Sequence, residues 1–413
     1  MENTNWGDLC HDTNKISQEL NILISRSKTK RDIILKLNPK TDACKIIELL
    51  ADDNHEFNSF LALCKLLKLV CSKNDARMAW EKNYYILNQH IIQFNTDYAL
   101  YEKLVSIPHN NLHDLLDKFF LNKIIKGFRK YGIFDNKANE RVKKVIPILS
   151  KINSLEEKLV SDYDIKDLLS LVQTRKEYIS LINYDNYILF QSEVDILNLK
   201  NTLQKLITPN IHNTCYHEIN TICKKINKNK LLLPDITKYR ESTINNHKLK
   251  LTEAFDIVIN FLTKLFNLTF IKQEKIITWS NNVEIYNIKY QNTTYGYLYI
   301  DLFKDNRKLP HLVSLILKEA VVYPYSSGVL NIPVMVLLGN HSIYISYLDV
   351  INIFKEMGNI LHAIFHRSKF QVINLDLNMR SFMSHLFEHI AYDIEVIKLF
   401  FPENKRPKMF MKQ

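Results

Sequence analysis

The chain has 413 residues, and 46% of them are hydrophobic, which is enough for a packed core and excludes wholesale disorder. Only 7 are glycines, which argues against a turn-rich all-β fold, and no Gly-rich phosphate-binding loop occurs. The net charge of +11 admits nucleic acid as a partner. Because the basic residues are dispersed, a lysine-rich solvated surface explains the charge more simply.

We expect no signal in this sequence that would direct it into or across a membrane. Its first residues are polar, and no apolar run reaches the roughly 18–20 residues of a membrane span. None of its six cysteines forms a CxxC pair, so a disulfide framework is not indicated. We therefore expect a cytoplasmic protein with reduced thiols, no signal peptide and no transmembrane segment.

The first half of the chain, residues 1–225, is predicted to be helical from about residue 12 onwards. Apolar residues recur at helical spacing in residues 57–67 and 112–120. Residues 141–159 form a long amphipathic pattern, with Pro147 inside it as a possible site of bending. The polar, basic stretch 226–250 then predicts a connection between two regions.

The second region, residues 251–413, changes its hydrophobic period. A helix is predicted over 251–266, and strands follow between about 268 and 338, at residues 276–279, 283–288, 294–302 and 333–338. The helical period then returns at about 348–366 and again at 382–400. These patterns predict a mainly α fold of the α+β class, with one small sheet placed before a long helix.

Four segments of the chain resemble, in order, motifs of one enzyme family. Residues 232–239 read Leu-Leu-Pro-Asp-Ile-Thr-Lys-Tyr, and residues 295–303 read Tyr-Gly-Tyr-Leu-Tyr-Ile-Asp-Leu-Phe. Residues 333–340 form an apolar strand that ends in Asn, and residues 353–362 read Ile-Phe-Lys-Glu-Met-Gly-Asn-Ile-Leu-His. Together they resemble the M3 family of zinc metallopeptidases, the group of thimet oligopeptidase, oligopeptidase A and oligoendopeptidase F. The resemblance implies that residues 251–413 form a peptidase-like catalytic lobe.

In that family the last segment reads L-F-H-E-F-G-H-x-x-H, where two His residues one helical turn apart bind zinc and the Glu serves the metal-bound water. Here Lys355 and Asn359 occupy the two His positions, and alignment of the following helix places Ser381 at the third ligand position. A lysine is protonated near neutral pH and repels a cation. We therefore expect no cofactor, since all zinc ligands are degraded, and only Glu356 remains as a residual general-base position. Gly358 is expected to let its helix approach the sheet closely.

The resemblance also implies a long C-terminal helical segment that supplies substrate-binding Tyr and His residues. The sequence ends at Gln413, so we expect that half of the cleft to be missing or supplied by another chain. The resulting hypothesis is an inactive metallopeptidase homologue, reused for structure or for binding a protein or peptide. Tyr295, Tyr297 and Tyr299 alternate along one strand and so share a face, which would either bind peptide or pack in the core.

Two alternatives stay open. His362 and His366 lie four residues apart on the predicted helix and could hold a displaced zinc, with a further ligand from His385, Glu388 or His389. This arrangement would make the chain a weakly active zinc oligopeptidase. The second alternative is a basic nucleic-acid-binding protein, which rests on the net charge.

Overall fold

A computed structural model describes residues 12–112, 114–161, 164–187, 190, 205, 209–228, 235, 248–274, 276–370 and 377–401. The chain divides into two compact units, and neither is one continuous stretch. One unit contains Met1–Leu23, Ala51–Tyr85 and His217–Gln413, and the other contains Ile24–Leu50 and Ile86–Tyr216. Of the connection expected at 226–250, residues 229–234 and 236–247 lie outside the described residues. Among the described helices, none is long and apolar enough to cross a membrane.

The described N-terminal half is helical, as the periodicity predicts. Its helices are α2 (Thr13–Lys36), α3 (Ala43–Val70), α4 (Asn74–Asn95), α5 (Tyr98–Val105), α6 (Leu115–Lys130), α7 (Ala138–Ser161), α8 (Ile165–Leu181) and α11 (Pro209–Ile226). Aspartates 97, 114 and 164 each accept a backbone hydrogen bond in the first turn of α5, α6 and α8, because those turns leave N–H groups without helical partners. Helix α7 continues through Pro147 and packs on α8 through Val145 and Ile152.

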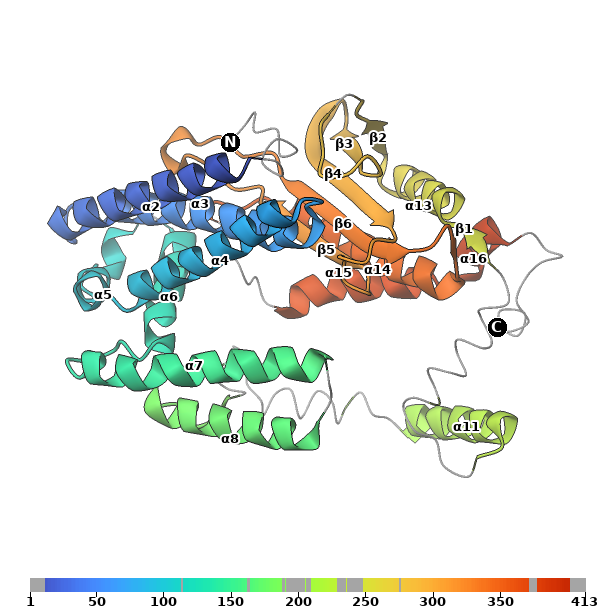
Figure 1. The fold of residues 1–413 in the computed structure, drawn as a ribbon, viewed down its shortest axis with the longest axis horizontal. Helices are drawn as coiled ribbons and strands as arrows, with labels where there is room; N and C mark the ends of the chain where they lie inside the picture. Colours follow the sequence, from blue (N-terminus) through green and yellow to red (C-terminus); the bar gives the residue numbers. More distant parts are fainter. Residues whose placement is uncertain are drawn as a thin grey trace. The chain divides into compact units, whose positions relative to one another are not determined.

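A five-stranded sheet lies in the unit that contains His217–Gln413 (Figure 1). Its strands are β2 (Leu268–Lys272), β3 (Glu284–Tyr290), β4 (Thr293–Phe303), β5 (Val313–Lys318) and β6 (Val334–His341), in the order β2-β3-β4-β6-β5. Strand β6 runs parallel to β4, and the other neighbouring pairs are antiparallel. A separate two-stranded pair joins β1 (Leu249–Lys250) to β7 (Tyr344–Ile345). Strand β5 is therefore an edge strand.

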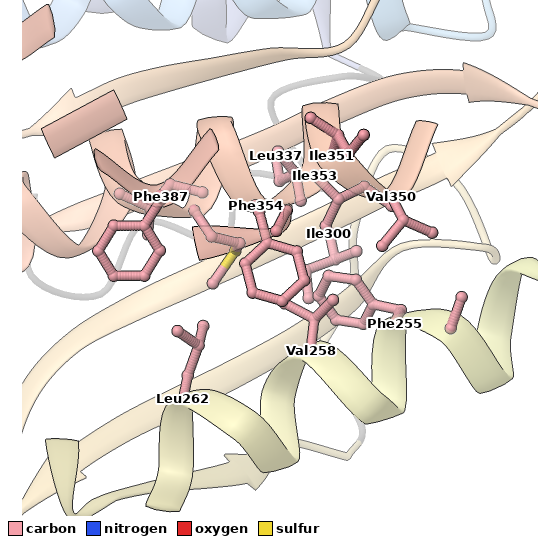
Figure 2. Close-up of a cluster of buried hydrophobic side chains, with 14 of the residues drawn as sticks. Phe255, Val258, Leu262, Ile300, Leu337, Val350, Ile351, Ile353, Phe354 and Phe387 are labelled. Carbon is pink, nitrogen blue, oxygen red and sulfur yellow. The ribbon is translucent and has the colours of Figure 1, made fainter. Parts of the chain in front are cut away.

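Besides the helical segments from the N-terminal half, this unit contains α13 (Leu251–Phe266), α14 (Tyr347–Phe365), α15 (Leu377–Ile390) and α16 (Ile394–Phe400). Helix α14 packs against β4, β5 and β6, and also against α13 and α15. Its fully buried Phe354 side chain points toward Phe255 and Val258 of α13 (Figure 2). A helix with apolar residues on most of its circumference needs neighbours on several sides, and that requirement sets α14 at the centre of the core.

The mainly helical α+β class is confirmed, and three details differ from the sequence prediction. Residues 276–279 form no strand, because Trp279 turns inward and stacks on Tyr299 with ring centroids 5.6 Å apart. Strands β2 and β5 are not among the four predicted strands, although β2 begins where the strand region was expected to begin. The helix expected over 382–400 is two helices, α15 and α16, and Asp393 caps the second of them by accepting from the Glu395 N–H.

Candidate functional site

The start of α14 is defined by local sequence. Ser346 and Asp349 form a capping box, in which each side chain accepts from the other residue's backbone N–H. Such a box satisfies N–H groups that the first helical turn leaves unpaired. The residues that follow at helical spacing are buried in the core, and the same spacing places Lys355, Glu356 and Asn359 at half-buried positions.

Lys355 lies beside an acidic residue of α15. Its Nζ is 3.9 Å from the Oε2 atom of Glu388, and the same oxygen is 3.2 Å from Nδ1 of His385. About a third of the Lys355 and Glu388 side chains remains exposed, so water screens the pair and it contributes little to stability. The pair matters for the local charge, because Lys355 places an ammonium group on this side of α14.

Glu356 connects α14 to the edge strand β5. Its Oε2 atom accepts hydrogen bonds from the Ser314 N–H at 2.9 Å, from the Ser314 hydroxyl at 2.5 Å and from the Asn359 amide at 3.2 Å. A carboxylate that accepts several hydrogen bonds is held in a defined orientation. The Asn359 side chain therefore presents its N–H₂ group, a donor, toward Glu356.

This arrangement is a helix whose Lys, Glu and Asn side chains face an edge strand and a second helix. The family model described as "Peptidase family M3" matches residues 151–411. The chain belongs to peptidase family M3.

One curated relative is a probable thimet oligopeptidase from Arabidopsis thaliana. It is 24% identical over 147 residues, a match that covers 33% of this chain and 20% of the relative. The chain thus spans about a fifth of the length of the curated relative that it matches. The match supports membership of M3.

The zinc ion that M3 peptidases use can be tested against the side chains at its ligand positions. Lys355 offers a cation, and Asn359 offers an amide whose N–H₂ group is directed at Glu356. Zinc in proteins takes Cys thiolate, His nitrogen or carboxylate oxygen. The two described positions therefore do not fit a zinc ion. Ser381 lies within α15, and its side chain is outside the described residues.

Gly358 sits where α14 meets α15. A Cβ atom added there would lie 2.5 Å from the carbonyl oxygen of Met383 and 3.0 Å from the Cβ of Phe387. The expected close approach is real, but its partner is helix α15 and not the sheet. A glycine is needed at this point because any side chain would overlap the backbone of the neighbouring helix.

His362 and His366 do lie together at the end of α14, with ring centroids 5.8 Å apart and planes inclined by 18°. Burial, followed by the neighbouring His362 and Arg367, lowers the pKa of His366, so this imidazole is neutral near pH 7. Glu388, one of the additional ligands considered for this pair, instead approaches Lys355 and His385. Within the described chain, no group of three or more His, Cys, Asp or Glu residues is arranged to hold a metal.

The three tyrosines of β4 are all partly buried. Tyr295 packs against Tyr290 and Phe365, and the Arg367 guanidinium lies 4.8 Å from its ring centroid. Tyr299 stacks on Trp279, and burial raises its pKa to about 12. The intervening residues Gly296, Leu298, Ile300 and Leu302 are buried on the opposite face. At least two of the tyrosines thus make packing contacts in this structure.

Two features near the site were not recognised in the sequence. Asp301 and Lys308 form a buried ion pair, and Trp279 donates its indole N–H to Asp301 at 2.8 Å. Asn340 fixes the same loop, because its Oδ1 accepts from the Asp305 N–H at 2.9 Å. The sequence signal that could have predicted the ion pair is a carboxylate, Asp301, within the apolar strand β4, with Lys308 seven residues later. These bonds hold the loop that leads into β5.

Proposed function

We propose that this chain is a catalytically inactive M3 homologue that keeps the fold in order to bind a protein or peptide partner. The observation that carries the proposal is the bonding of Glu356. Its Oε2 atom is engaged by Ser314 and Asn359, while a lysine stands at the preceding position. A general base must reach the proton that it removes, and it needs an activated water near it. Here the carboxylate serves as a tie between α14 and β5.

The binding part of the proposal rests on the edge of the sheet. In an antiparallel pair, alternate residues direct their backbone groups to the partner strand and away from it. The Ser314 N–H bonds to Glu356 and not to β6, so Ser314 and Ile316 are the residues of β5 whose backbone groups face outward. An extended peptide can add to such an edge through main-chain hydrogen bonds. Glu356 occupies the Ser314 N–H, so the Ser314 carbonyl and both Ile316 groups are the ones that, among the described residues, a peptide could pair with.

The first test is peptidase activity with added zinc. A mixture of short unstructured peptides should remain uncleaved by mass spectrometry, while an active M3 peptidase cleaves it in parallel. We expect no cleavage because the described ligand positions do not fit the metal. Cleavage that a chelator stops would contradict the proposal. If the double variant His362→Ala, His366→Ala also removed that activity, the displaced-ligand alternative would be correct.

The second test addresses the edge of β5. Peptides that bind the native chain should bind the Ile316→Pro variant much more weakly, because proline has no N–H to donate. An edge strand tolerates proline, so the fold should be kept. Ile316→Val is the matched control, since it keeps the N–H and the strand propensity. Binding by fluorescence anisotropy should fall at least about tenfold in the proline variant, the effect of one lost hydrogen bond and a blocked register. Equal binding by both variants, with unchanged thermal unfolding, would show that the peptide does not bind at the β5 edge.

The nucleic-acid alternative rests only on the net charge of +11. It requires binding that weakens steeply as salt rises, because phosphate contacts release counterions. No arrangement of side chains in the described chain favours it over the peptide-binding proposal.

A further inference from the structure

A cavity of about 180 Å³ lies away from the M3 ligand positions, between helix α13 and the ends of β2, β3 and β4. Buried apolar side chains form its inner wall: Leu251, Phe255, Ile300 and Leu302. Figure 2 shows Phe255 of α13 beside Ile300 of the sheet. Cavities of about 150 Å³ lined by such residues can hold benzene. The volume thus suits one aromatic ring or branched alkyl group with a short extension.

The exposed part of the lining is polar and mostly acidic. Asp256 and Glu284 contribute two carboxylates, and Lys272 contributes one ammonium group that lies 2.5 Å from Glu284. Tyr286 donates its hydroxyl to the other oxygen of Glu284 at 2.9 Å. Burial, together with Glu284, raises the pKa of Tyr286, so the phenol stays protonated and keeps this bond. Each carboxylate oxygen of Glu284 therefore already has a partner, Lys272 for one and Tyr286 for the other.

Asp256 differs from Glu284 in this respect. No lysine, arginine or histidine of the described chain forms an ion pair with it. Two carboxylates against one ammonium leave one unbalanced negative charge at the mouth of the cavity. Thr252 and Asn282 add hydrogen-bonding groups to the same lining. An apolar interior next to an uncompensated carboxylate is complementary to a ligand that carries an apolar group and a positive charge.

We propose that this cavity binds a small primary ammonium group attached to an aromatic or branched apolar group. The apolar group enters between Phe255 and the side chains of β4, and the ammonium pairs with Asp256. Two sources share this chemistry, a free aralkyl amine and the N-terminal residue of a peptide. The proposal does not depend on the M3 ligand positions, so it stands whether or not the chain cleaves peptides.

The test uses the full chain and 2-phenylethylamine as the probe, followed by NMR or calorimetry. We expect a Kd on the order of 1 mM, as befits a ligand of this size. The uncharged analogue 2-phenylethanol should bind about fivefold more weakly, the range of a partly exposed ion pair, and phenylacetate should not bind. Equal affinity for the amine and the alcohol, or no binding of the amine, would overturn the proposal.

Variants on one helix separate the site from general charge effects. Asp256→Asn should reduce the affinity for the amine to that for the alcohol. Glu253→Gln removes the same charge from a side chain that is 70% exposed and does not line the cavity, so its affinity should be unchanged. Thr252→Trp, at an exposed position of the lining, should block both ligands without disturbing the core. An Asp256→Asn variant that binds the amine like the native chain would contradict the assignment.

Two further probes distinguish the sources. Phe-Ala-amide has a free N-terminal ammonium, and its N-acetyl form does not. If the free dipeptide binds at least as tightly as 2-phenylethylamine and the acetylated one does not bind, a peptide N-terminus is the ligand class. If both dipeptides are excluded while the amine binds, the ligand is a free amine.

Discussion

The triple variant Lys355→His, Asn359→His, Ser381→Glu should bind about one zinc ion per chain, whereas the native chain should bind essentially none. The backbone of α14 still places positions 355 and 359 one helical turn apart. Two imidazoles at that spacing can reach one metal, and a carboxylate from α15 would complete three ligands. The variant also removes the ammonium group that now faces Glu388. Metal content after dialysis, measured by plasma mass spectrometry, gives the answer directly.

The matched control is the triple variant Lys355→Ala, Asn359→Ala, Ser381→Ala, which removes the same side chains without supplying ligands. It should remain free of zinc. Substitution by cobalt adds a second readout, since a bound Co²⁺ ion shows a visible spectrum that depends on its ligands. If the native chain retained one zinc through dialysis, the proposed inactivity would lose its basis. If only the His-containing variant retained zinc, the backbone would still place ligands correctly, and the native side chains would be the reason that the metal does not bind.

Asp301→Asn should lower the free energy of unfolding by about 3–5 kcal/mol, because it leaves the Lys308 ammonium buried without its counter-charge. The Lys308 and Asp301 side chains are 6% and 1% exposed. Lys308 also donates to the carbonyl oxygen of Phe303 at 2.7 Å, and a carbonyl cannot neutralise the charge. Urea unfolding followed by circular dichroism measures the loss.

Two comparisons make the Asp301 prediction specific. The double variant Asp301→Asn, Lys308→Met should lose much less than the sum of its single variants, since no charge is then left buried alone. Glu395→Gln breaks an exposed pair with Lys398 and should cost less than about 1 kcal/mol. A loss under about 1 kcal/mol for Asp301→Asn would mean that water reaches Lys308, contrary to its burial here.

The contacts of Glu356 give a physical reason for a glutamate at this position of α14. Its carboxylate ties α14 to β5 through both donors of Ser314. Hydrogen bonds to a charged acceptor contribute more to stability than neutral ones. The residue can therefore be retained for the packing of helix against edge strand, independently of any catalytic role.

Much of the fold followed from local pattern. Helix α13, at Leu251–Phe266, was predicted with the same bounds, and α14 was predicted within one residue. Both are strongly periodic, and periodicity reports the face that a helix buries. Strand β5 was missed because its six residues carry no clear alternation and follow an irregular loop. The segment 276–279 was mistaken for a strand because Trp279 has strand propensity, while its actual position is set by contacts with β4.

The sequence alone gives the residues at the positions that the resemblance assigns to the M3 zinc ligands, namely Lys355, Asn359 and Ser381. The family membership also comes from the sequence, since the M3 family model matches residues 151–411. Only the tertiary structure decided what these side chains do, because their partners are distant in the chain. Ser314, Glu388 and Met383 approach α14 through folding, and no local pattern announces them. Spacing along one helix predicts which residues share a face, whereas contacts between elements depend on how the whole core packs.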